Sequence, residues 1–328
     1  MRYIANTTEF HIETPTVVTL GKFDGRHRGH QKLMRKMQEV KEHLGYQTAV
    51  FTFSVAPAAM VTGEAQTVLT TNLERRNNMK KTGIDCLVEY PFTAETQHMS
   101  AEEFVREILV ERMNAKAIVV GTDCRFGYRR LGDARVLAEL SGKYGYQLYV
   151  IEKEKDDTRD RDISSTYIRE ELDKGNIEKA NELLGEPYAI HGTVVHGRHM
   201  GGSVLGFPTA NLVPPAIKRL PRFGVYVSRV LVDRKYYRGV TNIGKKPTIE
   251  GENPVGVETF IFDLDQDIYD QVIEVQLISF LRPERTFASL GELREQIARD
   301  KKRAAVYFEE HPEIRWGHEI AVGGGGND

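Results

Sequence analysis

The sequence predicts two domains of different class: an α/β domain with a doubly wound parallel sheet, followed by a small antiparallel β-barrel with a closing helix. Three observations lead to this prediction. The chain has 328 residues, which is enough for about two domains of ~150 residues each. In the first half, strand-like runs alternate with helix-like runs, whereas in the second half short strand-like runs follow one another with Gly and Pro between them. We expect domains at 1–185 and 186–310, and a tail at 311–328.

The first half alternates in the way that a parallel sheet requires. Strands are expected at 16–20, 48–53, 84–88, 117–120 and 147–151, and helices at 29–44, 73–82, 100–114 and 131–144. In the first of these helices, Leu33, Met37, Val40 and Leu44 recur at helical spacing. Ser100 followed by Glu103 forms a capping box for the third. Strands that alternate with helices pair in parallel through right-handed crossovers, which predicts the doubly wound sheet.

The pattern changes after the turn at 185–187, which contains Gly and Pro. Two short helices precede this turn, at 165–174 and 177–184. Strands are then expected at 188–195, 225–232, 236–242, 257–262 and 272–281, and an amphipathic helix at 289–308. Short strands at this spacing are typical of a small antiparallel sheet or barrel, with the last helix packed against it.

Composition excludes several classes of protein. Lys plus Arg is 45 and Asp plus Glu is 47, so the net charge is −2. The chain therefore lacks the broadly basic composition typical of nucleic-acid-binding proteins, and we expect no nucleic-acid partner. There is no run of 18 apolar residues, so no membrane span is expected, and the N-terminal segment lacks the apolar core of a signal peptide. Cys86 and Cys124 form no C-x-x-C pair, which argues against a disulfide framework or a zinc cluster and favours a cytoplasmic location. Assembly into a homo-oligomer stays open.

The segment GKFDGRHRGH at 21–30 lies where the first strand ends and the first helix begins. In an open α/β sheet this is where ligands bind, and Gly21, Gly25 and Gly29 let the backbone approach a phosphate. His27 and His30 are three residues apart, so they share one face of the helix and are placed to stabilise charge on a phosphate that is attacked. A metal pair would lack a third ligand nearby, and a structural role for His30 is the other alternative. We therefore predict nucleotide binding here.

Two later segments also follow strands or begin helices. In GTDCRFG at 121–127, Phe126 offers a flat surface for an aromatic ligand and Arg125 a charge for a phosphate, although a plain turn is the alternative. In ISSTYIR at 163–169, hydroxyl groups at the start of a helix are followed by Arg169, which suits a triphosphate; ordinary helix capping is the alternative. The charged stretch at 152–162 is expected to be a solvated loop rather than a lid.

These three segments, in this order and spacing, resemble the nucleotidyltransferase half of bacterial bifunctional riboflavin kinase/FAD synthetases. LGFPTAN at 205–211, GVTNIG at 239–244, VET at 257–259 and RPE at 282–284 resemble the riboflavin kinase half. The resemblance covers roughly residues 15–308. It implies a Rossmann-like nucleotidyltransferase domain and two reactions that use Mg²⁺: riboflavin and ATP give FMN and ADP, and FMN and a second ATP give FAD and diphosphate. Apo-flavoproteins would receive the FAD.

The resemblance also implies roles for individual residues. His27 and His30 would be catalytic in the first half, and Glu258 would be the general base of the second. In the first half, ATP and its phosphates would be bound by Gly21, Lys22, Phe23, Asp24, Gly29, Ser164, Ser165 and Arg169. The flavin would be bound by Asp123, Arg125 and Phe126, with Arg282 as a weaker candidate near flavin or nucleotide. In the second half, ATP would be bound by Gly201, Gly202, Thr209 and Asn211, of which Thr209 and Asn211 offer the hard oxygen atoms that suit Mg²⁺.

The chain departs from the family pattern at four positions. Cys124 stands where Phe is usual, Ser203 where Arg is usual, Phe260 where His is common and Asp270 where Gly is common. Asp270 would be strained if its φ is positive. These departures leave open an FAD synthetase whose second half binds flavin with a weak or inactive kinase function. A non-enzymatic, flavin-responsive binding protein is the alternative of another class.

Overall fold

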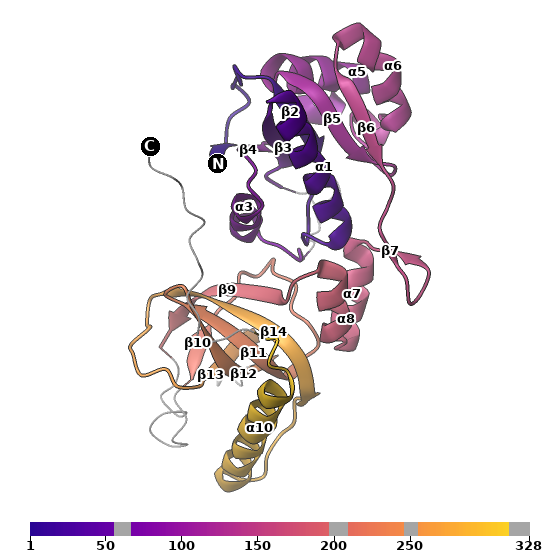
Figure 1. The fold of residues 1–328 in the computed structure, drawn as a ribbon. Helices are drawn as coiled ribbons and strands as arrows, with labels where there is room; N and C mark the ends of the chain where they lie inside the picture. Colours follow the sequence, from indigo (N-terminus) through magenta and orange to yellow (C-terminus); the bar gives the residue numbers. More distant parts are fainter. Residues whose placement is uncertain (56–66, 197–208, 246–254, 315–328) are drawn as a thin grey trace. The chain divides into compact units, whose positions relative to one another are not determined.

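The computed structural model describes residues 1–55, 67–196, 209–245 and 255–314. Contacts divide the chain into two compact units, Met1–Ser165 and Thr166–Asp328, and each is described here by itself (Figure 1). The domain boundary that the sequence places at 185 stays a prediction. Among the described residues, no helix is both long enough and apolar enough to cross a membrane.

The first unit contains a six-stranded sheet in which every pair of neighbours is parallel, as predicted. Its spatial order is β1 (Arg2–Ala5), β4 (Cys86–Tyr90), β3 (Gln47–Phe53), β2 (Thr16–Leu20), β5 (Ala115–Gly121) and β6 (Gln147–Ile151). The chain continues from β2 to β3 on one side and reaches β5 on the other, so the strand order reverses beside β2. This reversal is the point at which an open α/β sheet forms a ligand crevice.

Helices cover both faces of this sheet (Figure 1). Successive residues of a strand point to opposite faces, so a strand that is apolar throughout places side chains on both faces that have to be covered. Val18 belongs to one core and Val17 to the other. The helices are α1 (Arg28–Leu44), α3 (Asn72–Lys81), α4 (Ala94–His98), α5 (Ala101–Glu103), a π-helical stretch Phe104–Arg112, and α6 (Ala134–Tyr144). The predicted capping box at Ser100 is confirmed, but the predicted helix at 100–114 continues as a π-helix.

The stretch predicted to be a plain loop at 152–162 contains a small antiparallel ribbon, formed by β7 (Lys155–Asp156) and β8 (Arg161–Asp162). It follows β6 directly, so it stands at the carboxyl edge of the sheet. Arg28 on α1 donates a hydrogen bond to Glu154 at 2.8 Å, which ties this stretch to the start of the helix.

The second unit is a closed barrel, as predicted, with a helix packed on it. Around the barrel lie β10 (Ala210–Leu212), β13 (Val255–Ile261), β12 (Lys235–Lys245), β11 (Gly224–Val232), β14 (Val272–Pro283) and β9 (Tyr188–Val195). The unit also contains α7 (Ser165–Lys174), whose first residue lies at the division, α8 (Ile177–Leu184) and α10 (Leu290–Glu310).

The last helix, α10, closes the barrel from outside. Ala304 and Phe308 pack against Val225, Val227 and Val240 of the barrel wall. Asp270, in the turn before β14, has a φ of 61°, which is the conformation that the sequence analysis foresaw as strained for a residue standing in the place of Gly.

Candidate functional site

The two histidines of the first motif lie together at the amino end of α1, directly beyond the carboxyl end of β2. His27 caps the helix, and its Nδ1 accepts a hydrogen bond from the backbone N–H of His30 at 3.4 Å. The two rings are stacked, with centroids 3.7 Å apart and planes 20° apart. The backbone N–H groups of the first helical turn point out of the amino end of α1 and add a partial positive charge there. The arrangement suits a phosphate group.

The hydrogen bonds of the two rings assign them different proton positions. Nδ1 of His30 lies 2.9 Å from the carbonyl oxygen of Gly25, which can only accept, so this nitrogen carries the proton. Nδ1 of His27 accepts, so its neutral ring carries the proton on Nε2. Burial, and secondarily the neighbouring His30, lowers the pKa of His27 to about 2, and burial lowers the pKa of His30 as well. Both rings are therefore neutral before an anion arrives, and His27 already offers an N–H donor.

The loop between β2 and α1 is held by contacts from three other segments. Phe23 adopts a φ of 48°, and its buried ring lies 5.1 Å from that of His30. The N–H of Gly25 donates to Oγ1 of Thr70 at 2.9 Å, and the N–H of Thr70 donates to the Asp24 carboxylate at 3.0 Å. Ser165 donates from its hydroxyl to the carbonyl of Asp24 at 2.6 Å. The structure thus brings Phe23, Asp24 and Ser165 together with the histidine pair.

Two of the motif glycines leave room for neighbouring rings. A Cβ atom added at Gly21 would lie 3.3 Å from the Phe23 ring, and one added at Gly29 would lie 3.2 Å from Cε1 and Nδ1 of His27. The side chain of Lys22 is exposed, whereas its backbone carbonyl accepts a hydrogen bond from Arg75. Glycine at these positions therefore shapes the place where the histidine pair stands.

The carboxyl ends of β5 and β6 border an open cavity of about 410 Å³. It is lined by charged and polar side chains: Thr122, Asp123, Arg125, Glu152, Lys153, Lys155 and Asp162. Two of the predicted flavin-binding residues, Asp123 and Arg125, are among them. The cavity is polar and mixed in charge, so it suits a ligand with both phosphate and hydrogen-bonding groups.

Phe126 does not offer the flat open surface that the sequence analysis expected. Its ring is 6% exposed, packs 5.6 Å from Phe104 in the core, and lies so close to Gly132 that a Cβ there would come within 2.6 Å. Mutual backbone hydrogen bonds between Phe126 and Gly132 hold this turn, which explains the burial. The predicted contact between Phe126 and flavin stays a prediction. The adjacent Cys124 has its pKa raised to about 12, first by burial, so its thiol is unreactive.

The other residues predicted for the first site lie just before α7 and within it. Ser164 is half-buried just before the helix, and Arg169 is half-buried within it and belongs to the second unit. Their predicted contacts with the triphosphate stay predictions.

In the barrel, the predicted base lies in one row with two amides. Glu258 on β13 is directly opposite Asn211 on β10 and directly opposite Asn242 on β12. Residues opposite each other on neighbouring strands project to the same face, so the three side chains share one side of the wall. The Asn211 side-chain nitrogen donates to the backbone carbonyl of Thr209 at 3.2 Å, which brings the two predicted Mg²⁺ ligands together. Sequence reasoning missed Asn242, although it lies within the GVTNIG segment.

A further carboxylate lies near this row. Burial, opposed by Arg282 and assisted by Glu258, raises the pKa of Glu284. Its Oε1 is so close to Gly244 that an added Cβ would lie 1.8 Å away. Glycine at 244 is therefore required for this carboxylate to reach the strand.

Arg282 is held by the closing helix. Its guanidinium donates to the Asp300 carboxylate at 2.8–3.1 Å, and Asp300 is 2% exposed and also accepts from Gln296. The charge is thus already paired within the barrel unit, and its predicted approach to flavin or nucleotide stays a prediction. Gly201, Gly202 and Ser203 lie outside the described residues.

Comparisons with known proteins agree with both halves. A family model described as FAD synthetase matches residues 9–167, and one described as riboflavin kinase matches residues 184–308. A protein of Bacillus subtilis (strain 168) named bifunctional riboflavin kinase/FMN adenylyltransferase is 34% identical over 301 residues, covering 90% of this chain and 93% of that protein. A protein of the same name from Escherichia coli (strain K12) is 36% identical over 295 residues, covering 89% and 92%.

The likeness extends to a solved structure. A chain described as a macrolide-efflux protein from Streptococcus pneumoniae superposes with a TM-score of 0.81 at 31% identity, covering 92% of this chain and 98% of that one. The match thus includes the fold of both units. Together with the two relatives, each matched over more than nine-tenths of its length, it shows that the chain belongs to the family of bifunctional riboflavin kinases/FMN adenylyltransferases.

Proposed function

We propose that the α/β unit transfers the adenylyl group of ATP to FMN, and that the barrel unit transfers the γ-phosphoryl group of ATP to riboflavin. The observation that carries the first assignment is the stacked pair His27 and His30 at the amino end of α1, beside the point where the strand order reverses. The row of Glu258 with two amides on the barrel wall supports the second.

In the first reaction, a phosphate oxygen of FMN attacks the α-phosphorus of ATP. The bond to the bridging oxygen of the β-phosphate breaks, and diphosphate leaves. Because the phosphate of FMN is already a nucleophile, the protein needs to align the two groups and neutralise charge. His27 donates from Nε2 as a neutral ring, whereas His30 donates from Nε2 only after it gains a proton. The negative charge of the bound triphosphate favours that protonation.

In the second reaction, the terminal hydroxyl of riboflavin attacks the γ-phosphorus and ADP leaves. Glu258 takes the hydroxyl proton as the new bond forms. Thr209 and Asn211 fit Mg²⁺ because a hydroxyl and an amide oxygen are hard donors, and the two residues are joined by a hydrogen bond from the Asn211 amide to the Thr209 backbone carbonyl. They would hold the ion against the nucleotide, where it would neutralise phosphate charge. FAD from the first unit would then pass to apo-flavoproteins.

Two variants separate the reactions. His30→Ala is expected to abolish conversion of FMN to FAD while riboflavin is still converted to FMN, and Glu258→Gln is expected to do the reverse. Each variant is incubated with ATP and Mg²⁺, with riboflavin and with FMN in separate tubes, and the flavins are separated by HPLC. Equal loss of riboflavin conversion in one tube and of FMN conversion in the other, in either variant, would contradict the assignment of the reactions to separate units.

The second candidate function is an FAD synthetase with a weak kinase half, which the departures at Phe260 and Asp270 favour. The same assay decides it: parent protein that makes FAD from FMN and leaves riboflavin unchanged would establish this alternative. A binding protein without catalysis would form neither product.

A further inference from the structure

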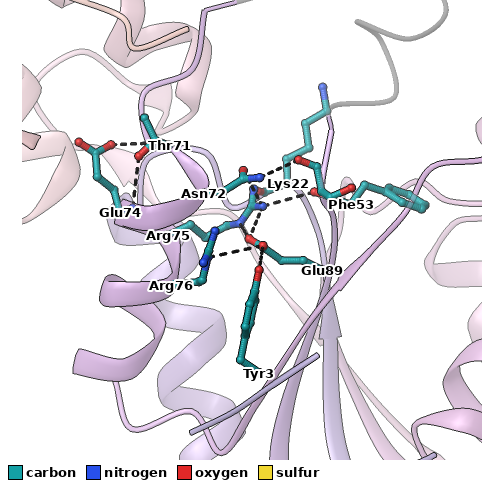
Figure 2. A network of polar contacts seen from close by, with 10 residues as sticks. Tyr3, Lys22, Phe53, Thr71, Asn72, Glu74, Arg75, Arg76 and Glu89 are labelled. Atoms are coloured by element: carbon teal, nitrogen blue, oxygen red, sulfur yellow. Dashed lines mark hydrogen bonds and ion pairs between the residues drawn. The ribbon is translucent and has the colours of Figure 1, made fainter. Parts of the chain in front are cut away.

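A buried ion pair lies next to the loop between β2 and α1 of the first unit. Arg75, on the first turn of α3, donates from Nε and Nη2 to Oε1 of Glu89 on β4, at 3.1 and 2.6 Å. Arg75 is 7% exposed and Glu89 is 2% exposed. Glu89 is also bound through its second oxygen, which accepts from the Tyr3 hydroxyl at 2.5 Å and lies 3.7 Å from Arg76. Figure 2 shows these side chains converging on the Glu89 carboxylate.

The same guanidinium reaches the backbone at the ends of two neighbouring strands. Nη1 of Arg75 donates to the carbonyl of Lys22, just after β2, and Nη2 donates to the carbonyl of Phe53, the last residue of β3, both at 3.4 Å (Figure 2). Asn72 accepts from Nη2 at 3.0 Å and donates to the carbonyl of Ser54 at 2.9 Å. One side chain therefore connects the carboxyl ends of β2, β3 and β4.

The position of the Lys22 carbonyl matters because the next residue of the chain is Phe23. Phe23 has a φ of 48°, a backbone conformation that residues other than glycine rarely adopt. Its ring packs against His30. Arg75 fixes the backbone before Phe23, and Thr70, from the segment leading into α3, fixes the backbone after it through Asp24 and Gly25. The segment 70–75 thus holds the strained turn from both sides.

The positive charge of Arg75 is already paired inside the protein, which argues against a direct contact between Arg75 and a ligand. Its guanidinium N–H groups donate to Glu89, to two backbone carbonyls and to Asn72. The low-dielectric surroundings keep this geometry rigid, because a buried carboxylate without its partner is strongly disfavoured. Burial and the bond to Glu89 raise the pKa of Tyr3 to about 12, so its hydroxyl keeps its proton at neutral pH and stays a donor to Glu89.

We propose that Arg75 is a positioning residue for the adenylyl transfer: its ion pair with Glu89 fixes the Lys22 carbonyl and so holds Phe23 and the histidine pair in place. This inference rests on the proposed function of the first unit. It assigns the segment 70–75 a part in the reaction that none of the recognised motifs includes.

The test compares steady-state kinetics of FAD formation from FMN in four purified variants of the full chain. Arg75→Met is expected to lower kcat for FAD formation by ~100-fold, the effect of a catalytic group displaced by about 1 Å, with a smaller change in the KM for ATP. Arg75→Lys retains a cation for Glu89 but has a single donor nitrogen, so it is expected to recover part, but not all, of that loss. Asn72→Ala removes the acceptor for Nη2 and the bond to the Ser54 carbonyl but leaves the ion pair with Glu89, and it is expected to lower kcat by several-fold in a fully folded protein.

The matched control is Lys41→Met, which breaks another ion pair between a helix and the sheet. Lys41 on α1 contacts Asp85 at 2.6 Å, just before β4 and therefore at the opposite edge of the sheet. This variant is expected to leave kcat for FAD formation unchanged. Riboflavin phosphorylation by the same preparations reports the barrel unit, and thermal unfolding reports how much of the first unit is folded.

The outcomes are distinct. Loss of kcat in Arg75→Met and Asn72→Ala, with partial recovery in Arg75→Lys and none lost in Lys41→Met, supports the proposal. It is overturned if folded Asn72→Ala and Arg75→Lys keep the parent kcat, or if Lys41→Met loses as much as Arg75→Met. Failure of the parent protein itself to form FAD from FMN would instead contradict the proposed function.

Discussion

Gly29→Ala is expected to stabilise the first unit and to impair its reaction. Gly29 is the second residue of α1, and its φ is not in the left-handed region, so alanine fits the backbone. In a helix, alanine is favoured over glycine by about 0.8–1.0 kcal/mol. The new Cβ, however, would lie 3.2 Å from Cε1 and Nδ1 of His27, closer than ordinary van der Waals contact.

The imidazole has to give way by a few tenths of an ångström, because the helix backbone holds the Cβ. This movement disturbs both its stacking on His30 and the direction of its Nε2–H. We expect kcat/KM for FAD formation to fall by at least ~10-fold, which corresponds to about 1.4 kcal/mol of transition-state stabilisation. The melting temperature of the first unit is expected to stay the same or to rise by up to ~2–4 °C, since part of the helix gain offsets the contact.

Gly142→Ala is the matched control, because Gly142 is also within a helix, α6, and its added Cβ would meet nothing within 4 Å. It is expected to raise the melting temperature with no effect on either reaction. Calorimetry and HPLC of the flavins, on parent and both variants, give the two readouts. Gly29→Ala with full FAD formation would refute the reasoning that His27 has to stand where the structure has it.

Three further predictions concern pH, backbone strain and the closing helix. The lowered pKa of His27 means that the unfolded chain binds a proton below pH 6.5 that the folded state does not, so stability falls as pH falls, by about 1.4 kcal/mol per pH unit for each such histidine. His27→Asn, which keeps a capping side chain, is expected to remove one proton from that slope in denaturant titrations at pH 5–6.5, and an unchanged slope would contradict this. Asp270→Gly is expected to raise the stability of the barrel unit by about 0.5–1 kcal/mol in denaturant unfolding, because it relieves a φ of 61°; a loss of stability would contradict this. Arg282→Met leaves Asp300 buried without its partner and is expected to lower the free energy of unfolding by about 3–5 kcal/mol. Most of this loss is expected to be recovered in the Arg282→Met, Asp300→Asn double variant. An unchanged melting temperature with lost flavin binding would instead favour the ligand role that the sequence implies.

Local patterns predicted most of the fold because the patterns and the structure share one cause. The strands predicted at 16–20 and 147–151 have the predicted bounds in the structure. The helices predicted at 165–174 and 177–184 have them too. Each is a periodic or apolar run, and three of the four are followed directly by glycine, at 21, 175 and 185. The strands β1 and β10 were missed because they have four and three residues, too few to show a period.

The site was predictable where its residues are neighbours in sequence. His27 and His30 are three apart at a helix start, so their meeting follows from the helix itself. The partnership of Arg75 with Glu89 depends on how α3 packs over β4, and no local pattern encodes it. Phe126 is the converse case. An aromatic residue after a strand resembles a ligand wall, whereas here the turn back to Gly132 buries its ring, and its contact with flavin stays a prediction.

The central claim is that one chain carries out both reactions in separate units, and one time course tests it most directly. Parent protein is incubated with riboflavin, ATP and Mg²⁺, and the flavins are separated at intervals. We expect FMN to appear first and FAD to come after it, while His30→Ala stops the course at FMN. FAD formed only when FMN is supplied would contradict the claim for the barrel unit, and the absence of FAD from both substrates would contradict it for the α/β unit.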